Sequence, residues 1–175
     1  MSMKMIDVLG QVKGVTVYAT KDGVPEEFPC TIDAEVSLPQ ITHPTATMQS
    51  MGDMDVADQT RVNPMVMTIS CEPSVIQSKL LGYGVQSYVL RWAQEVKKAN
   101  GDFDLIPFVA YVSGIPSEDT SSTVRPGEST TGTISVNTFK YRLLCDGKEI
   151  RYVDKTKGIL KINGVDYRAK INSML

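Results

Sequence analysis

The sequence is poor in the residues that most enzymes use for chemistry. It contains a single histidine, His43, and three cysteines that lack the spacing of a metal site or an activated nucleophile. The glycines Gly82 and Gly84 lack the third glycine and the lysine of a phosphate-binding loop. Asp33 and Glu35 stand close together, yet a polar strand face accounts for both carboxylates. These absences argue against catalysis, and we expect neither a metal nor a cofactor.

Long hydrophobic runs are also missing. No segment approaches the ~20 apolar residues that cross a bilayer, and the first ten residues lack the apolar core of a secretory signal. We therefore expect no membrane insertion and synthesis in a cytoplasm, where Cys30, Cys71 and Cys145 stay reduced and buried in strands. With 42% hydrophobic residues, residues 1–175 are sufficient for one globular domain.

Positive charge is absent from a long part of the chain. No Lys or Arg occurs between Asp22 and Thr60, where there are eight acidic residues, whereas Lys140 to Lys170 contains nine basic and four acidic residues. The net charge of −2 argues against a strong grip on nucleic acid, which needs a basic face. The asymmetry fits two solvated faces of a monomer, or head-to-tail contacts in which acidic surface meets basic surface.

Strand patterns dominate the first half of the sequence. Thr31 to Leu38 alternates between apolar and polar residues, so one face packs on a core and the other looks away from it. Asn63 to Glu72 alternates in the same way, and Gly14 to Ala19 reads as a further strand. Between them, Pro25 and Pro29 predict a connection broken by prolines.

The middle of the sequence is less clear. Residues 73–82 predict one short helix, because a proline opens the segment and a glycine ends it. Gln86 to Lys98 fits a strand or a helix, and the Asn100-Gly101 turn that follows favours a strand. The next β run, 104–112, contains Pro107, which predicts an edge position or a bulge.

The C-terminal part, from Thr130 to Leu175, predicts a β-meander. Its alternation changes phase after Asn137, which requires a bulge or a crossing between sheets. Asp146-Gly147 and Asn163-Gly164 each separate two β-rich runs, and both dipeptides tolerate the positive φ angles of tight hairpin turns.

Two segments show no regular period. Gln40 to Asn63 predicts a long projecting loop, and its methionines suit an adaptable contact surface better than a solvated tail. We expect this loop to become ordered against a neighbouring subunit. Residues 114–129 are rich in Ser, Thr, Pro and Gly and predict a second long surface loop.

Several strings, in the right order, resemble one protein family. YRLLCDGKEI (residues 141–150), followed by Asp154 and then by KINGVD (residues 161–166), is similar to the C-terminal third of the major tail tube protein of contractile-tailed phages. Val36-Ser37-Leu38-Pro39, followed by a loop with Met51-Gly52, resembles the first inner strand and the projecting loop of that family. The strings span nearly the whole chain.

This resemblance implies a structural protein with a mainly β fold. The fold would be a twisted β-sandwich or half-open barrel with one short capping helix, whose inner sheet joins those of its neighbours into a ring-wide barrel. Hexameric rings would stack into the inner tube of a contractile tail, through which DNA passes without specific binding. The implied partners are further copies of the chain and the sheath, baseplate and tape-measure proteins. The implied location is a virion tail or an extracellular contractile particle, assembled in the host bacterial cytoplasm.

The resemblance also predicts roles for three sets of residues. The ring-stacking loop comprises Met48, Met51, Gly52, Asp53, Met54, Asp55 and Asp58. The faces turned away from the core would line the channel through Asp33, Glu35, Ser37, Thr68, Ser70 and Glu72. A basic surface toward other subunits or the sheath comprises Lys148, Arg151, Lys155 and Lys161.

Other functions stay open at this level. The same protein would serve as the tube of a headless phage-tail-like bacteriocin, and a type VI secretion tube is a more distant alternative. A monomeric β-sandwich that binds a sugar or peptide belongs to a different class, and it would leave the methionine-rich loop unexplained.

Overall fold

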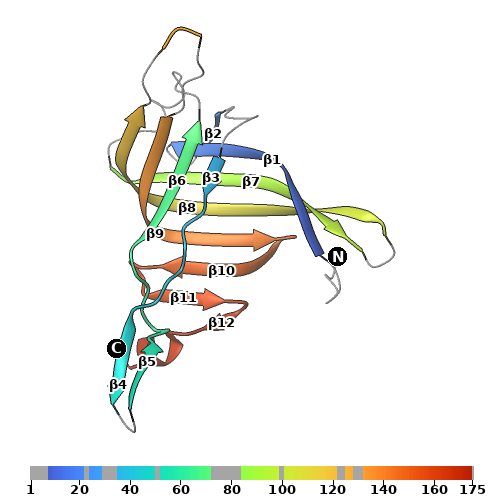
Figure 1. Ribbon diagram of the computed structural model, residues 1–175. Helices are drawn as coiled ribbons and strands as arrows, with labels where there is room; N and C mark the ends of the chain where they lie inside the picture. The colour runs from blue at the N-terminus through green and yellow to red at the C-terminus, as the bar shows by residue number, and fades with distance from the viewer. Residues whose placement is uncertain are drawn as a thin grey trace.

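The computed structural model describes residues 8–21, 24–28, 35–49, 52–71, 84–98, 101–121, 125–127 and 132–174. These residues form antiparallel strands and one helical turn (Figure 1). The first strands are β1 (Val8–Lys21), β2 (Val24–Phe28), β3 (Glu35–Ser37), β4 (Thr45–Gln49), β5 (Asp53–Ala57) and β6 (Met65–Cys71). They are followed by β7 (Gln86–Lys97), β8 (Phe103–Ser121), β9 (Gly132–Cys145), β10 (Lys148–Asp154), β11 (Ile159–Ile162), β12 (Val165–Asp166) and α2 (Ala169–Asn172).

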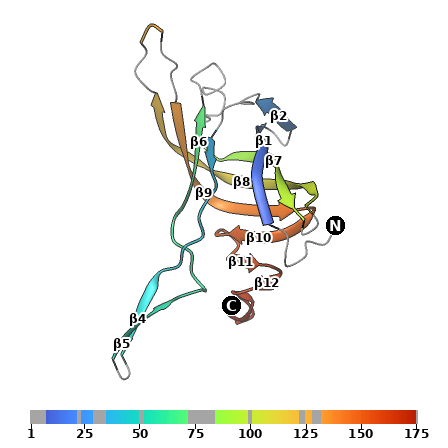
Figure 2. The ribbon, with the colours of Figure 1, turned by 45° about the vertical axis from the view of Figure 1, so that its right-hand side comes forward.

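All described strands except β4 and β5 belong to one strongly bent sheet. Its strand order is β12-β11-β10-β9-β8-β7-β1-β2, and β6 joins it on β9 and carries β3 on its other side. In Figures 1 and 2, β3 and β6 cross steeply over the strands behind them, so the sheet folds over its own core. The prediction of a mainly β, half-open barrel is confirmed, because the described strands do not close into a ring.

The crossing depends on β9, which changes partner halfway along its length. Its first half pairs with β6, and its second half pairs with β10, while β8 pairs with both halves. The register against β8 skips Phe139, since Ser113 pairs with Lys140 and Gly114 pairs with Thr138. The buried positions accordingly change phase at this bulge, from Thr138 to Tyr141. The predicted phase change is confirmed, and it involves both a bulge and a crossing.

The core lies between the two halves of the bent sheet. The largest fully buried side chains come from β1, β6, β7, β8, β9, β10 and β11: Tyr88, Tyr141, Met67, Ile69, Leu90, Ile134, Leu160, Val17, Val112, Val136 and Val153. The rings of Trp92 and Phe108 stack at its margin, with centroids 5.3 Å apart. The alternation predicted for 63–72 is confirmed by buried Met65, Met67 and Ile69. Burial of this apolar area is the main stabilising term.

The predicted hairpin turns and the ambiguous strand agree with the structure. Asp146 and Gly147 have φ angles of 49° and 73°, and Asn163 and Gly164 have 50° and 81°, which suit two-residue hairpins. Residues 86–97 form β7, so the choice of strand is confirmed. Pro107 occupies a local edge, because the pairing between β8 and β9 begins one residue later, at Phe108.

Two of the predictions for connections are wrong, and the C-terminus holds an unexpected element. Pro25 lies within β2, at the outer edge of the described sheet, where a missing N–H costs no ladder bond. The predicted loop at 114–129 begins too early, because β8 continues as a strand to Ser121. The meander itself is as predicted but ends in the helical turn α2, which the sequence pattern did not indicate.

Some predictions fall outside the described residues. These are residues 29–34 with Cys30 and Asp33, Met51, Glu72 and the helix predicted at 73–82.

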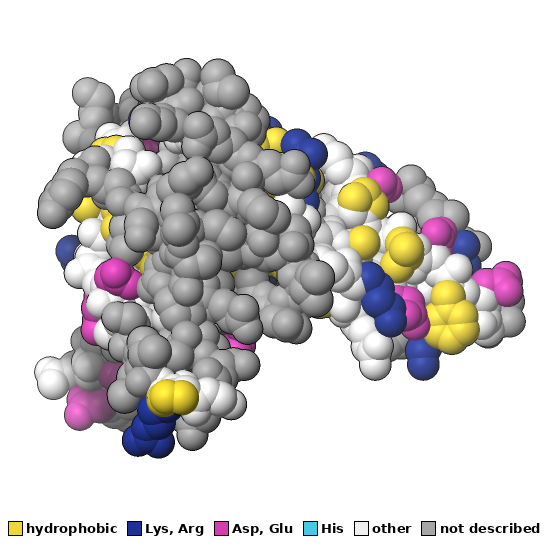
Figure 3. All heavy atoms as spheres, turned by 90° about the horizontal axis from the view of Figure 1, so that it is seen from above, with side chains coloured by type: hydrophobic (Ala, Val, Ile, Leu, Met, Phe, Trp, Pro, Cys, Tyr) yellow, Lys and Arg dark blue, Asp and Glu magenta, His cyan; other side chains and the backbone are white. Residues whose placement is uncertain are grey.

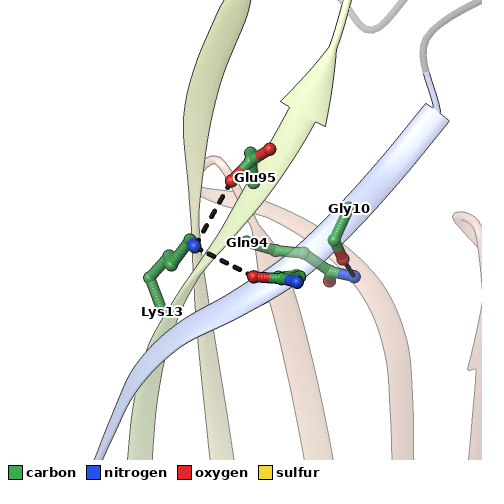
Figure 4. A network of polar contacts seen from close by, with 5 residues as sticks. Gly10, Lys13, Gln94 and Glu95 are labelled. Atoms are coloured by element: carbon green, nitrogen blue, oxygen red, sulfur yellow. Dashed lines mark hydrogen bonds and ion pairs between the residues drawn. The ribbon is translucent and has the colours of Figure 1, made fainter.

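Near its N-terminal end, β1 is held against β7 by polar contacts. Its register against β7 shifts twice, between Leu9 and Val12 and again before Val15. Lys13 reaches the carboxylate of Glu95 at 3.5 Å, and the side-chain amide of Gln94 donates to the carbonyl of Gly10 at 3.3 Å (Figure 4). These contacts hold the irregular part of β1 on the sheet where ladder pairing is interrupted.

The turn after β10 depends on the buried carboxylate of Asp154. Its Oδ1 accepts hydrogen bonds from the Thr156 hydroxyl at 2.6 Å and from the backbone N–H groups of Thr156 and Lys157 at 3.1 Å. Burial raises the pKa of Asp154, but these hydrogen bonds outweigh it, and the pKa is lowered from 3.8. The ionised form is therefore the one that the turn stabilises.

We predict that Asp154→Ala lowers the free energy of unfolding by about 1–3 kcal/mol, because two N–H groups lose their acceptor. In the native protein this contribution is fully present above pH 3.8, the unfolded pKa, and is lost as the pH falls through the lower folded pKa. Thermal unfolding from pH 7 to pH 2 measures it. Asp154→Asn should show a smaller loss of stability on acidification than the native chain, and an equal loss would contradict this account.

Candidate assembly surfaces

The most prominent surface is the hairpin formed by β4 and β5. Within the described part of the chain the two strands pair only with each other, and Met48 lies directly opposite Met54. The hairpin extends away from the rest of the molecule in both ribbon views (Figures 1 and 2). Every described residue of the two strands is exposed, including Met48 at 56% and Met54 at 59%. Apolar side chains so far from any core suit contact with another molecule.

Backbone and side-chain hydrogen bonds continue the hairpin into an ordered stem. Asp58 N–H donates to Pro44 O at 2.8 Å, and Asn63 N–H donates to Thr42 O at 2.9 Å. His43 Nδ1 lies 2.7 Å from Arg61 O, so the side chain of the sole histidine links the two strands of the stem. The segment predicted as a loop is thus a regular two-stranded arm whose direction depends on its base.

Asp58 shapes the stem locally. The hydroxyl and the backbone N–H of Thr60 both donate to its carboxylate, and they lower its pKa from 3.8. This predicted stacking residue therefore has a structural partner within the stem. Asp53 and Asp55 lie on the exposed strand β5, where Asp55 accepts a hydrogen bond from Thr47 at 2.8 Å.

A second surface is the polar face of the sheet β3-β6-β9-β8. Cross-strand pairs place Glu35 opposite Ser70 and Ser37 opposite Thr68, so four of the predicted channel residues share this face. The pairing of β6 with β9 adds Thr133, Ser135 and Asn137, and the pairing of β9 with β8 adds Glu118 and Thr120, none of which belongs to the predicted set. Val66 and Ile115, both opposite Asn137 and both exposed, are apolar side chains on the same, mostly polar face. Among these described residues the only charges are carboxylates. The other two predicted channel residues, Asp33 and Glu72, lie outside the described part of the chain.

The same four-stranded sheet has two open edges within the described residues. β3 pairs with β6 alone. β8 leaves β7 at Gly114, and from Ile115 to Ser121 it pairs with β9 alone. Backbone N–H and C=O groups at such edges are templates for pairing with another strand. Open edges at both sides of one sheet suit repeated, head-to-tail pairing between copies.

The predicted basic residues lie in three places. Lys148 and Arg151 are exposed on β10, and Lys161 lines a groove of about 490 Å³ across the outer face of β7–β11. Lys140 and Arg142, which were not in the predicted basic surface, line the same groove. There Arg142 forms an ion pair with Glu149 at 2.6 Å. Lys155 is different, because its Nζ donates to the carbonyl of Asn63 in the hairpin stem at 2.7 Å.

Exposed apolar side chains also gather where β7 and β8 meet. Phe103 and Leu105 are 63% and 57% exposed, and the ammonium of Lys97 lies 5.5 Å from the centroid of the Phe103 ring. Viewed from above, apolar and charged side chains alternate over the right-hand lobe of the molecule (Figure 3). This mixed surface is a further place for contact between copies.

Chemical sites are not apparent in the described part of the chain. There, no group of three or more His, Cys, Asp or Glu side chains is placed to hold a metal ion. No described helix has the length and apolarity required to cross a membrane. Burial raises the pKa of the Cys145 thiol, which disfavours the reactive thiolate.

Comparison with known proteins identifies a family. Residues 26–175 match the family model described as "Phage tail tube protein FII". Among solved structures, the chain is similar to a chain of the PVC sheath–tube complex, an extracellular contractile injection system in its extended state. Their identity is 10% and the TM-score is 0.47, over 74% of this chain and 87% of the other. It is also similar to a chain of the anti-feeding prophage baseplate, with 12% identity and a TM-score of 0.45, over 82% and 97% of the two chains. No curated protein sequence matches the chain.

Proposed function

Because the chain belongs to the phage tail tube protein FII family and is a structural subunit of a tail tube, we propose that it forms hexameric rings that stack into a hollow conduit. The observation that carries this proposal is the pair of open edges on the sheet β3-β6-β9-β8. The role is structural, and the proposal includes no catalytic step and no cofactor.

Ring closure follows from pairing between the two edges. In the proposal, β3 of one copy pairs with residues 115–121 of β8 in the next copy. A row of subunits joined in this way still has one free β3 edge and one free β8 edge at its two ends. Further subunits can therefore be added until the ring closes. A closed barrel has no edge left to aggregate, which removes the hazard that the isolated subunit carries.

The polar face of this sheet then lines the channel. The opposite face carries Met67, Ile69 and Val136 and is committed to the core. Repetition of Glu35 and Glu118 around the ring gives the channel a negative potential. DNA bears one negative charge per about 1.7 Å of axis and binds basic walls through release of counterions, so an acidic wall lets it slide.

The hairpin accounts for stacking. It leaves the body at the base of the same sheet, and its paired Met48 and Met54 stay more than half exposed among the described residues. We propose that their partner is a subunit of the adjacent ring. We further propose that the groove with Lys140, Arg142 and Lys161 binds an acidic surface of a sheath or baseplate protein outside the tube.

Electron cryo-microscopy of the purified chain tests the proposal. We expect rings and tubes with the β3-β6-β9-β8 sheet toward the channel. A protein that stays monomeric at high concentration, or tubes with this sheet on the outside, would overturn it. The same subunit serves a phage tail or a headless particle, and the presence of capsid genes beside its own gene distinguishes them.

A paired substitution tests the channel more sharply. Asp33→Lys combined with Glu35→Lys should leave rings and tubes intact, because Glu35 is exposed on a polar face. In an assembled phage the variant should slow or block DNA ejection, since a basic wall holds the polymer. Asp33→Asn with Glu35→Gln is the matched control and should eject normally. Normal ejection by the lysine variant would show that wall charge has no part in transport.

A further inference from the structure

We infer that Lys155 is a positioning residue that sets the direction of the β4–β5 hairpin before assembly. This inference depends on the stacking role of the hairpin in the proposed function. It concerns a contact between two segments that are 92 residues apart in the sequence.

Lys155 contacts the stem at the point where its two strands are joined. Its Nζ donates to Asn63 O at 2.7 Å. The backbone N–H of Asn63 donates to Thr42 O at 2.9 Å, and its side-chain amide donates to Thr42 Oγ1 at 3.2 Å. A hydrogen bond to Asn63 therefore acts on both strands of the stem together.

The other end of this contact is anchored in the body of the molecule. The backbone N–H of Lys155 donates to Phe139 O at 2.9 Å, at the bulge where β9 changes partner. The preceding residue, Asp154, is buried and closes the turn that follows. Lys155 is exposed as a whole, but partial burial lowers its pKa, which agrees with an ammonium group turned toward the protein. The contact thus joins the stem to a rigid point of the sheet.

Apolar packing keeps the stem on the body but does not set its angle. Ile41 and Val62 are partly buried against the core at the base of the stem. Such contacts are non-directional, whereas a hydrogen bond from a charged donor depends on distance and angle. The strands beyond the base are exposed, so the angle at Asn63 determines where Met48 and Met54 lie.

A fixed angle favours stacking because less conformational freedom is lost on docking. A hydrogen bond of this kind, at a largely exposed site, changes the ratio of held to released hairpins by a factor of about 3 to 10. Every subunit of a ring carries the same hairpin, so the effects of the single contacts combine during assembly. Removal of the Lys155–Asn63 hydrogen bond should therefore reduce polymerisation more clearly than it reduces the stability of the subunit.

Lys155→Met tests the inference, because it keeps the aliphatic part of the side chain and removes the donor. We expect the concentration needed for tube formation to rise by a factor of about 3 or more, with little change in the melting temperature of the subunit. Lys155→Arg keeps a charged donor and should restore part of the assembly. Lys157→Met is the matched control, since Lys157 lies in the same turn, is exposed and contributes only its backbone N–H to it.

A distance measurement separates positioning from general stability. Spin labels at Gln49→Cys and Ile115→Cys, in a chain with Cys30, Cys71 and Cys145 replaced by Ser, report the hairpin angle in the unassembled subunit. The distance distribution should widen in Lys155→Met and stay narrow in Lys157→Met. An unchanged distribution, or unchanged tube formation by Lys155→Met, would overturn the inference. Normal tubes after removal of the whole hairpin would instead overturn the stacking role itself.

Discussion

Removal of the β4–β5 hairpin is expected to leave a folded subunit that forms no tubes. Among the described strands the hairpin pairs only with itself, and all of its described strand residues are exposed, so its loss takes nothing from the described core. Asp58 N–H and Pro44 O are hydrogen bonded at 2.8 Å, so residues 45–57 are replaceable by a two-residue Asn-Gly turn. Tube formation by negative-stain microscopy and the melting temperature are the two measurements.

A milder variant keeps the hairpin and changes only its apolar contact. Met48→Ser with Met54→Ser removes the exposed apolar pair, and tube formation should fall sharply while the melting temperature stays the same. Thr45→Ser with Thr47→Ser, on the same arm, is the control and should assemble normally. Tubes of normal length from the methionine variant would show that the hairpin stacks through its backbone or its acids, and normal tubes from the deletion would make the hairpin a bystander.

Gly114→Ala is expected to be the most damaging glycine-to-alanine substitution among the described residues. A Cβ at this position would lie 2.4 Å from Asn137 O and 2.7 Å from Val136 Cγ1, and the first of these atoms is backbone. The strands β8 and β9 would have to separate at the bend of the sheet. We expect a loss of about 3 kcal/mol or more in the free energy of unfolding, which lowers the melting temperature by roughly 6–12 °C in a chain of this size.

Calorimetry of the Gly114→Ala and Ser117→Ala variants compares their losses of stability. Ser117 is exposed on the same strand, and its side chain makes one weak hydrogen bond to Ser135 O at 3.3 Å. Its replacement should cost less than about 1 kcal/mol. Similar melting temperatures for the two variants would mean that the bend has room to relax, and that the close approach at Gly114 does not determine the fold.

Patterns that act over a few residues were readable in the sequence. Asp146-Gly147 and Asn163-Gly164 are turns because few other dipeptides adopt two positive φ angles easily. The alternation of 65–71 follows from a strand with one buried face. The change of phase after Asn137 was visible as well, although the sequence did not tell a bulge from a crossing.

Residues 114–121 form a strand that local sequence patterns did not predict. Its Ser, Thr, Pro and Gly residues are typical of loops, and local propensity alone predicts one. The structure makes it a strand because β9 supplies pairing partners as far as Ser121, despite a register shift between Pro116 and Glu118, and because Gly114 lets the two backbones approach closely. Strand propensity depends on the neighbours a segment finds, so the sequence of the segment is a poor guide.

The assembly surfaces divide in the same way. The alternation of Glu35 and Ser37 with Val36, and of Thr68 and Ser70 with Ile69, determined which side chains turn away from the core. The exposed methionines of the hairpin were visible as residues out of place in an acidic, irregular segment. Neither pattern contained the order of strands, so the open edges of β3 and β8 were not predictable.

By itself, then, the sequence determined the β-meander, its turns and the polar and apolar faces of β3 and β6, since all of these depend on neighbours along the chain. The tertiary structure decided the partner change of β9, the extension of β8, the two open edges and the hydrogen bond from Lys155 to Asn63. Each of these joins segments distant in sequence, and their pairing depends on which strands bury the most apolar surface together once the whole sheet has formed.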